Sequence, residues 1–377
     1  MKKSLFIIVH VDWAFISHRL PIALAARYSG YDVTIVTKDT GRGKEIESYG
    51  LNFIDIPFER TGTNPIHELK CIYILTKIYK RFKPDIIHHV TIKASLLGCI
   101  AAKLSKRRRV VSAISGFGYN FTDERNGFKQ KLIKTMMRVS FKSRFFQYIF
   151  QNPDDVKQFS QYNFVKEHQI HLIKGSGVDL NIFKFKKKQL TDKVLFVLPA
   201  RIVFDKGVME FIDAAKILGK KAAGNAEFIL VGECDSINLS GISEEKLRSL
   251  IDEPYIKWIG FQKDILKILI ESDVVVLPSY REGLPKSLIE ACAIGRPIIT
   301  TDTQGCRECV IDEYNGFIIP MKNSEILAER MEILLNDPLK RELMGENSRL
   351  LAEKWFSIEL VINKHLCIYK GFEDINK

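Results

Sequence analysis

Short runs rich in valine and isoleucine alternate with longer helical stretches along the first part of the chain. Because buried parallel strands read as continuous apolar runs joined by helical crossovers, this alternation predicts a doubly wound parallel sheet. The helical stretches expected are Leu20–Tyr28, closed by Gly30, and His67–Phe82. The strands expected are 5–9, 32–37, 52–56, 85–89 and 109–114.

The alternation of strands and helices is interrupted by the lysine-rich segment 183–188 and then continues. A chain of 377 residues can bury two cores, so we expect two Rossmann-like domains, 1–188 and 189–359, with a helix at 360–377 packed back on the first. Ligands of open α/β sheets bind outside the carboxyl ends of the strands, which predicts an active site in a cleft between the facing domains. The strands expected in the second half are 194–199, 227–231, 256–259, 274–278 and 297–301.

Several classes of protein do not fit the sequence. The 7 cysteines are odd in number and scattered, and Cys306 and Cys309 lack a second pair or a nearby histidine, so neither a disulfide framework nor a metal site is expected. No apolar run reaches the roughly 18 residues of a membrane span. The apolar start is cut short by His10 and Asp12, which favours a buried strand over a signal peptide. We therefore expect a cytoplasmic protein without a metal or cofactor.

The charge is divided unevenly between the two halves. Residues 1–188 carry 33 Lys and Arg against 15 Asp and Glu, a net charge of +18, whereas the remainder carries 24 against 30, or −6. A basic half indicates an anionic partner, either a nucleic acid or a membrane surface. No nucleic-acid-binding motif is present.

The segment 128–150 has the pattern of a basic amphipathic helix. Such a helix can lie on an anionic membrane, or it can pack on the core and leave a solvated basic face. The charge of the first half favours peripheral contact with the inner face of the cytoplasmic membrane. The apolar face comprises Leu132, Ile133, Met136, Met137, Phe141 and Phe145, and the basic remainder comprises Lys129, Lys131, Lys134, Arg138, Lys142 and Arg144, near Lys103 and Lys106–Arg109.

Two carboxylates flank a predicted strand–turn–helix junction in the second half. A buried strand ends at Pro278, a turn carries Glu282, and Pro285 suits the first position of a helix that contains Glu290. The free backbone N–H groups at the start of a helix form a binding site for phosphate. Glu282 can accept hydrogen bonds from sugar hydroxyls and Glu290 from a ribose diol.

This segment resembles the E-x7-E region of the retaining, GT-B-fold glycosyltransferases of the GT4 family, and the likeness continues across nearly the whole chain. The resemblance implies that Arg201 and Lys206 hold the donor diphosphate, and that Glu282 is catalytic with them. Arg offers a planar fork and Lys a point charge for phosphate oxygens. The donor-binding residues that it implies are Gly232, Glu233, Phe261, Gly283, Leu284 and Glu290.

The first half resembles a bacterial GT4 subgroup that extends lipid-linked precursors of O-antigen, capsule or glycans. The likeness rests on the stretches 12–21, 116–121, 151–155 and 175–179. Within the subgroup, it is greatest to N-acetylgalactosaminyltransferases acting on undecaprenyl-diphosphate sugars. The loop after the first strand lacks the paired glycine of the common family pattern. The acceptor-side residues implied are Trp13, His18, Arg19, Lys93, Gly116 and Gly118, whereas His88 and His89 are expected to be structural.

The resemblance implies transfer of a hexose or N-acetylhexosamine, from UDP-GalNAc or UDP-GlcNAc, to an undecaprenyl-diphosphate saccharide in surface polysaccharide synthesis. No Asp-x-Asp is present, so cations and a helix start would neutralise the leaving diphosphate. The alternatives left open are an epimerase or phosphorylase of the same fold and a non-catalytic sugar-nucleotide-binding protein. An NAD or FAD enzyme is disfavoured, because no strand is followed by G-x-G-x-x-G.

Overall fold

The computed structural model describes residues 2–58, 64–114, 135–163, 165–189, 191, 193–222, 224–235, 238 and 240–374. The chain divides into two compact units, the first formed by residues 1–176 and 359–377 and the second by residues 177–358. The division lies just before the lysine-rich segment 183–188. Almost all of the last helix, α14 (Ile358–Asp374), belongs to the first unit.

The first unit is built on a seven-stranded sheet in the order β3-β2-β1-β4-β5-β6-β7, in which every pair is parallel. The first five strands confirm the strands expected from the sequence, within a residue or so at each end. The order reverses between β1 and β4, so the loops after these two strands leave the sheet side by side. The strands are β1 (Ser4–Ile8), β2 (Asp32–Thr37), β3 (Asn52–Asp55), β4 (Ile86–Val90), β5 (Val110–Ile114), β6 (Phe146–Phe150) and β7 (Ile170–Leu172).

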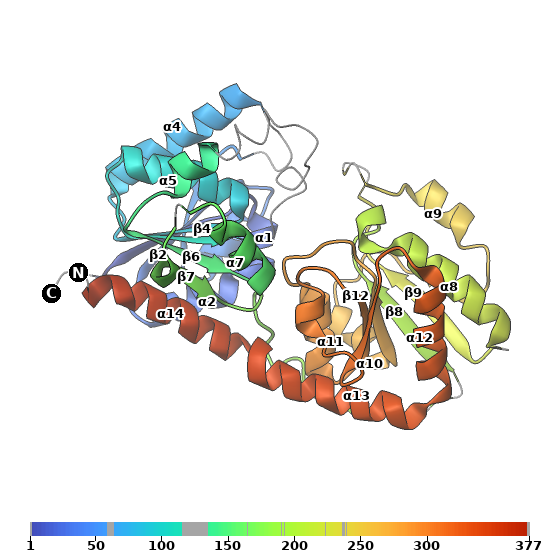
Figure 1. Cartoon of the computed structure of the whole chain (residues 1–377). Coiled ribbons are helices and arrows are strands. Elements are labelled where there is room, and N and C mark those ends of the chain that lie inside the picture. The colour runs from blue at the N-terminus through green and yellow to red at the C-terminus, as the bar shows by residue number, and fades with distance from the viewer. Residues whose placement is uncertain are drawn as a thin grey trace. The chain divides into compact units, whose positions relative to one another are not determined.

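Helices cover both faces of this sheet (Figure 1). On one face α4 (Pro65–Phe82) and α5 (Ile92–Leu104) pack on a core that includes Phe6, Ile87 and Tyr148. On the other face lie α2 (Leu20–Tyr28) and α14, whose His365 and Tyr369 rings meet His88 of β4 at 5.5 and 5.8 Å between centroids. The shorter helices are α1 (Asp12–His18), α3 (Gly43–Ser48) and α7 (Pro153–Ser160).

The prediction of one amphipathic helix over residues 128–150 is wrong. The described part is helical only over 135–141, and residues 146–150 form β6, because this aromatic run pairs with β5 inside the sheet. Met137 and Phe141 of the predicted apolar face are fully buried in the core, whereas Met136 is 41% exposed. Arg138 and Lys142 are exposed, as in the alternative of a solvated basic face. Leu132, Ile133, Lys129, Lys131 and Lys134 lie outside the described residues.

The second unit has a six-stranded sheet in the order β10-β9-β8-β11-β12-β13, again with every pair parallel. Its order reverses between β8 and β11, so the loops after these strands emerge next to each other at the switch point. Both sheets confirm the predicted doubly wound α/β class. The strands are β8 (Val194–Pro199), β9 (Ala226–Val231), β10 (Ile256–Trp258), β11 (Val274–Leu277), β12 (Ile298–Thr301) and β13 (Gly316–Ile319).

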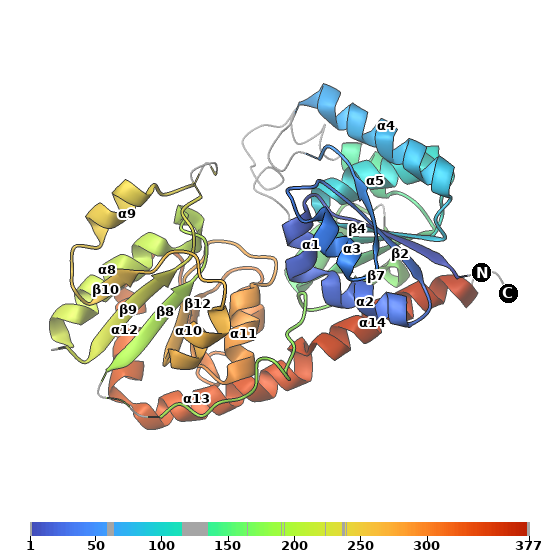
Figure 2. The same cartoon turned by 180° about the vertical axis from the view of Figure 1, so that it is seen from behind.

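Helices pack on both faces of the second sheet (Figure 2). On one side, α8 (Val208–Lys221) and α12 (Ser324–Asn336) cover a core in which the Phe196 and Phe228 rings stack at 5.4 Å. On the other side lie α10 (Ile265–Glu271) and α11 (Lys286–Ile294). The remaining helices are α9 (Glu244–Leu250) and α13 (Pro338–Leu351), with a π-helical turn at Ala352–Phe356.

Candidate active site

The loop after β8 carries both cations predicted for the donor diphosphate, and it touches the loop after β11. The carbonyl oxygen of Asp205 accepts hydrogen bonds from Ser279 Oγ and from the Tyr280 N–H, both over 2.9 Å. Gly207 has a φ of 70°, and a Cβ there would lie 2.1 Å from the Pro278 carbonyl oxygen. Glycine is therefore required directly after Lys206, because any side chain would push the two loops apart.

Lys206 and Glu282 form an ion pair at this switch point. Lys206 Nζ donates to Glu282 Oε1, and Ser279 Oγ lies 3.2 Å from the same oxygen. The two side chains are only 19% and 13% exposed, so water shields their attraction incompletely. The sequence assigned Lys206 to the diphosphate and Glu282 to the sugar, and the structure brings the two side chains to one point. A phosphate that binds Lys206 must therefore compete with the Glu282 carboxylate.

Arg201 begins the same loop, and its guanidinium donates to the Asp235 carboxylate. Asp235 follows β9 and the predicted Gly232–Glu233 turn. Gly232 has a φ of 152°, and a Cβ there would lie 1.9 Å from the Ala200 carbonyl oxygen. The loops after β8 and β9 can approach each other this closely only because residue 232 is glycine.

The loop after β10 is tied to the same glycine. Trp258 Nε1 donates to the Gly232 carbonyl oxygen over 2.8 Å, and the Gly232 N–H donates to the Gly260 carbonyl oxygen over 2.9 Å. These bonds hold Phe261 beside the strand ends with its ring 71% exposed. Glu233 is also exposed. An exposed aromatic ring on a fixed loop can stack on a flat ligand such as a nucleobase.

A third loop, after β12, supports the turn that carries Glu282. The Glu282 N–H donates to the Gln304 carbonyl oxygen over 3.2 Å. Gly305, with a φ of 78°, approaches so closely that a Cβ would lie 2.5 Å from the Gly283 carbonyl oxygen. Leu284 is buried and anchors the turn, and Pro285 then caps α11. α11 thus begins at Lys286, four residues after Glu282, with Pro285 at the N-cap rather than at the predicted first helical position.

Glu290 lies one turn into α11 and is nearly buried, with 6% of its surface exposed. Its Oε1 is 3.5 Å from Nζ of Lys286. Burial raises the pKa of Glu290, while the Lys286 ammonium opposes this shift. Because little of the carboxylate is exposed, it can accept only a few hydrogen bonds from a ligand, such as those from one diol.

Neither buried cysteine in this region has the properties of a nucleophile. Burial raises the pKa of Cys306 to about 11, with the nearby Glu282 charge adding to the shift, so the thiol stays protonated. Cys309 is also fully buried. Among the described residues, no group of three His, Cys, Asp or Glu side chains is arranged to hold a metal ion.

In the first unit, the loop after β1 is held by a buried carboxylate. Asp12 accepts hydrogen bonds from the N–H groups of Trp13, Thr40 and Arg42 and from the Thr40 hydroxyl, over 2.6 to 3.1 Å. Burial would raise the pKa of Asp12, but these four hydrogen bonds stabilise the charged form and leave the pKa below its usual value. The adjacent Trp13 side chain is 41% exposed and can meet a ligand.

The predicted acceptor-side residues His18 and Arg19 differ in exposure. His18 is half-buried, with Nδ1 3.4 Å from Ser176 Oγ. Arg19 is 4% exposed and lies near His88, His365 and Tyr369. Burial lowers the pKa of Arg19 to about 10, and Tyr369 opposes this shift. The Arg19 side chain is therefore buried behind the loop after β1 and does not face solvent.

The remaining residues predicted for the acceptor side are paired, buried or outside the described residues. Lys93 Nζ is 2.6 Å from Glu68 Oε1, so its charge is already neutralised by α4. His88 and His89 are fully buried, and His89 Nε2 lies 3.1 Å from the Tyr79 hydroxyl, which suits the structural role expected for both. Gly116 and Gly118 lie outside the described residues.

The sequence reasoning missed three residues that organise the donor loops. Asp235 is 34 positions from its partner Arg201, and no local pattern links them. Ser279 joins the loops after β8 and β11, and its place three residues before Glu282 was the available signal. The Tyr280 hydroxyl donates to Glu210 Oε1 over 2.6 Å and fixes the turn against α8.

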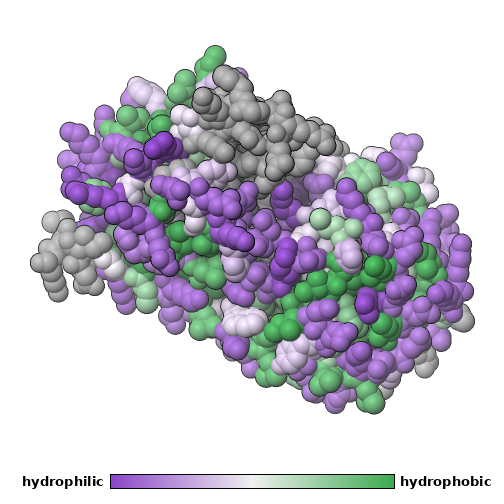
Figure 3. Space-filling view, viewed as in Figure 1, coloured by the Kyte–Doolittle hydropathy of each residue, from purple (hydrophilic) through white to green (hydrophobic). Residues whose placement is uncertain are grey.

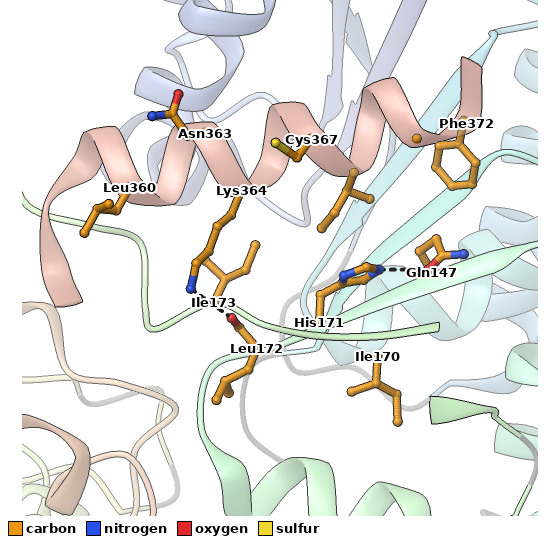
Figure 4. A pocket seen from close by; sticks show the side chains of 12 residues that line it. Gln147, Ile170, His171, Leu172, Ile173, Leu360, Asn363, Lys364, Cys367 and Phe372 are labelled. Carbon is orange, nitrogen blue, oxygen red and sulfur yellow. Dashed lines mark hydrogen bonds between the residues drawn. The ribbon is translucent and has the colours of Figure 1, made fainter. Parts of the chain in front are cut away.

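A separate groove of about 680 Å³ lies in the first unit between α14 and the edge of the sheet (Figure 4). His171 and Gln147 form its floor and share a hydrogen bond of 2.8 Å, while Lys364 reaches from α14 to the Leu172 carbonyl oxygen over 3.4 Å. None of the predicted site residues lines it.

Comparisons with known proteins agree with this arrangement. The model of the family Glycosyl transferase 4-like matches residues 5–152, and that of Glycosyl transferases group 1 matches residues 181–351. HepE from Anabaena, solved in complex with UDP, superposes with a TM-score of 0.77 at 19% identity, covering 98% of this chain and 100% of that one. This likeness shows the GT-B fold.

Two curated relatives match over almost their whole length. The N,N'-diacetylbacillosaminyl-diphospho-undecaprenol alpha-1,3-N-acetylgalactosaminyltransferase of Campylobacter jejuni is 30% identical over 375 residues, covering 96% of each chain. The UDP-Gal:alpha-D-GlcNAc-diphosphoundecaprenol alpha-1,3-galactosyltransferase of Escherichia coli is 25% identical, covering 90% of this chain and 89% of the relative. With both halves matched and a full-length relative at this identity, the chain belongs to the GT4 family of GT-B glycosyltransferases and is a hexosyltransferase.

Proposed function

We propose that this glycosyltransferase moves a hexose or N-acetylhexosamine from a UDP-linked donor to a saccharide carried on undecaprenyl diphosphate. UDP-GalNAc and UDP-GlcNAc are the proposed donors, and surface polysaccharide synthesis is the proposed purpose. The two relatives support a lipid-linked acceptor, since both are named for transfer to diphospho-undecaprenol sugars. The observation that carries the proposal is the Lys206–Glu282 ion pair at the switch point of the second sheet, with Arg201 at the start of the same loop.

In this proposal each donor-side residue has one task. Arg201 and Lys206 neutralise the diphosphate as it leaves, together with the start of α11. Glu282 leaves the Lys206 ammonium to the phosphate and accepts hydrogen bonds from the sugar hydroxyls. Phe261 stacks on the base, and Glu290 holds the ribose diol. The acceptor attacks the face that the diphosphate leaves, and a phosphate oxygen takes its proton, so the configuration is retained without a protein nucleophile.

The acceptor side is proposed to be the loop after β1. Asp12 fixes this loop through four hydrogen bonds, which leaves Trp13 and His18 to contact the acceptor saccharide or its diphosphate. Arg19 is a positioning residue, because its side chain is buried beneath that loop. No helix in the described part of the chain is long and apolar enough to span a bilayer. We propose that the enzyme reaches its lipid-linked acceptor from the cytoplasmic face of the membrane.

Transfer can be tested with the purified full chain, a panel of UDP-sugars and a short-chain prenyl-diphosphate saccharide. Mass spectrometry should find the acceptor extended by one sugar, and the coupling constant of the new anomeric proton should report retained configuration. Reactions without acceptor serve as the control. Conversion of the UDP-sugar to its epimer without acceptor, or no extension with any donor of the panel, would contradict the proposal.

A further inference from the structure

Helix α4 has two apolar faces, and the core uses only one of them. Cys71, Leu75 and Tyr79 point into the first unit and are buried. The opposite face carries a second apolar row comprising Ile66, 78% exposed, Leu69, 65% exposed, and Tyr73, 58% exposed.

The spacing of the exposed row places its side chains together. Positions i, i+3 and i+7 fall on one side of an α-helix, so Ile66, Leu69 and Tyr73 form a continuous ridge along the first half of α4. In Figure 3 hydrophobic and hydrophilic residues stand side by side along the upper edge of the molecule, over α4. Adjacent large apolar side chains held in water are costly, and they mark a surface that another phase or molecule covers.

The charges on this face all have one sign. Lys70 is exposed within the ridge, and Lys77, Lys80 and Arg81 are exposed after it, toward the end of α4. Lys77 Nζ lies 4.5 Å from the centre of the Tyr73 ring, so a cation borders the ridge directly.

The single acidic residue of α4 is turned away from this face. Glu68 is only 20% exposed and is paired with Lys93 of α5 over 2.6 Å. The outer face of α4 therefore presents apolar side chains and cations with no carboxylate among them. This combination is complementary to an anionic lipid surface, which accepts apolar side chains at the acyl boundary and attracts cations to its phosphates.

We propose that the outer face of α4 docks the enzyme on an anionic lipid surface. Ile66, Leu69 and Tyr73 enter the boundary between headgroups and acyl chains, and the four cations lie among the lipid phosphates. The surface predicted on residues 128–150 offers less to a membrane, because Met137 and Phe141 are buried and Met136, at 41%, is the one exposed residue among the described members of its apolar face. The inference deepens, and for its purpose rests on, the proposed lipid-linked acceptor, because a docked enzyme meets an acceptor confined to the bilayer.

The test is sedimentation of the full chain with vesicles of phosphatidylglycerol and phosphatidylcholine, compared with phosphatidylcholine alone. The wild-type protein should pellet with the anionic vesicles and be released by high salt. Ile66→Ser/Leu69→Ser should weaken binding at least about 10-fold, since each side chain loses burial of its apolar surface. Lys77→Gln/Lys80→Gln should weaken it about 30-fold, because each cation near an anionic surface contributes about five-fold.

Matched controls carry the same changes elsewhere. Leu339→Ser/Leu343→Ser removes two exposed leucines from α13, where they are 78% and 58% exposed. Lys364→Gln/Lys370→Gln removes two cations from α14, on the opposite face of the first sheet. The leucine control should bind vesicles as the wild type does, and the lysine control should lose much less than the α4 variant. Unchanged melting temperatures and UDP affinity would show that the α4 variants are folded.

Two results would overturn the inference: a wild-type chain that ignores anionic vesicles at low salt, or α4 variants that bind them as well as the controls do. A parallel assay of transfer to a soluble acceptor without a lipid chain separates this inference from the proposed function. Normal transfer together with absent vesicle binding refutes the docking surface alone. Vesicle binding through α4 without transfer from any donor supports the docking surface and refutes the transferase proposal.

Discussion

The ion pair between Lys206 and Glu282 makes an unusual prediction about donor binding. If the diphosphate competes with Glu282 for the Lys206 ammonium, Glu282→Gln should tighten the binding of UDP rather than weaken it. The pair is partly buried, and releasing the ammonium from such a partner is worth about 1 kcal/mol, or about five-fold in Kd. Turnover should fall by about 100-fold, because the sugar loses the group that orients it.

Lys206→Ala should act in the opposite direction on UDP. Losing a charge-assisted contact costs about 1.5–3 kcal/mol, or roughly 10- to 150-fold in Kd. The loss should lie toward the upper end, since the Glu282 carboxylate is then left uncompensated beside the diphosphate. The double variant Lys206→Ala/Glu282→Gln should therefore bind UDP better than Lys206→Ala alone, whereas a simple loss of contacts would make the double variant bind UDP more weakly.

Isothermal titration calorimetry with UDP, beside initial rates with the nucleotide sugar, would measure both effects. Glu245→Gln is the matched control, because Glu245 is an exposed glutamate of α9 with another glutamate, Glu253, at the same spacing as in the Glu282–Glu290 pair. If Glu282→Gln weakens UDP binding as much as Lys206→Ala does, the carboxylate supports the nucleotide directly and the competition argument is refuted.

Three further predictions follow from the described contacts. Burial lowers the pKa of His89 and of His365 to about 3, with Arg19 adding to the shift at His365. The unfolded chain takes up these protons below about pH 6.5, so the stability of the fold should be full above that pH. As the pH drops toward 3, the free energy of unfolding should fall by about 1.4 kcal/mol per pH unit for each histidine. Denaturant titrations that give the same free energy of unfolding at pH 7 and pH 5 would contradict this. Gly207→Ala should abolish UDP binding, because the new Cβ would meet the Pro278 carbonyl oxygen. The control Gly224→Ala has a φ of 90° but no atom within 4 Å of the new Cβ, so it should cost only about 1–3 kcal/mol of stability and leave calorimetric UDP binding intact. Transfer should persist in excess EDTA, since cations can serve the diphosphate, and loss of activity restored by added Mg²⁺ or Mn²⁺ would show otherwise.

The sequence alone was enough to predict two parallel sheets and the strands that bear the donor loops, although β6, β7 and β13 were not among the predicted strands. Buried parallel strands are short, apolar and regularly separated by amphipathic helices, so β8 and β11 could be read from composition and spacing. The resemblance to the GT4 family indicated Arg201 and Lys206, and the strand–turn–helix pattern together with that resemblance indicated Glu282. These features are local, and local patterns survive in a single sequence.

Contacts between distant residues had to come from the tertiary structure. The strand order puts β8 next to β11, and only that neighbourhood makes Lys206 and Glu282 partners across 76 positions of sequence. The same holds for Asp235 beside Arg201. No periodicity encodes such a meeting, because it depends on how the sheet is wound.

The two basic helices show the same limit most clearly. Residues 135–141 and α4 both combine apolar side chains with cations. The fold buries Met137 and Phe141, whereas it leaves Ile66 and Leu69 in solvent because Cys71 and Leu75 already face the core. Hydrophobic periodicity indicated a helix at α4, whereas the helix predicted over residues 128–150 is interrupted by strand β6. Which apolar face remained free for a partner was decided by packing, since a sheet face offers room for only some of the apolar surfaces that the sequence contains.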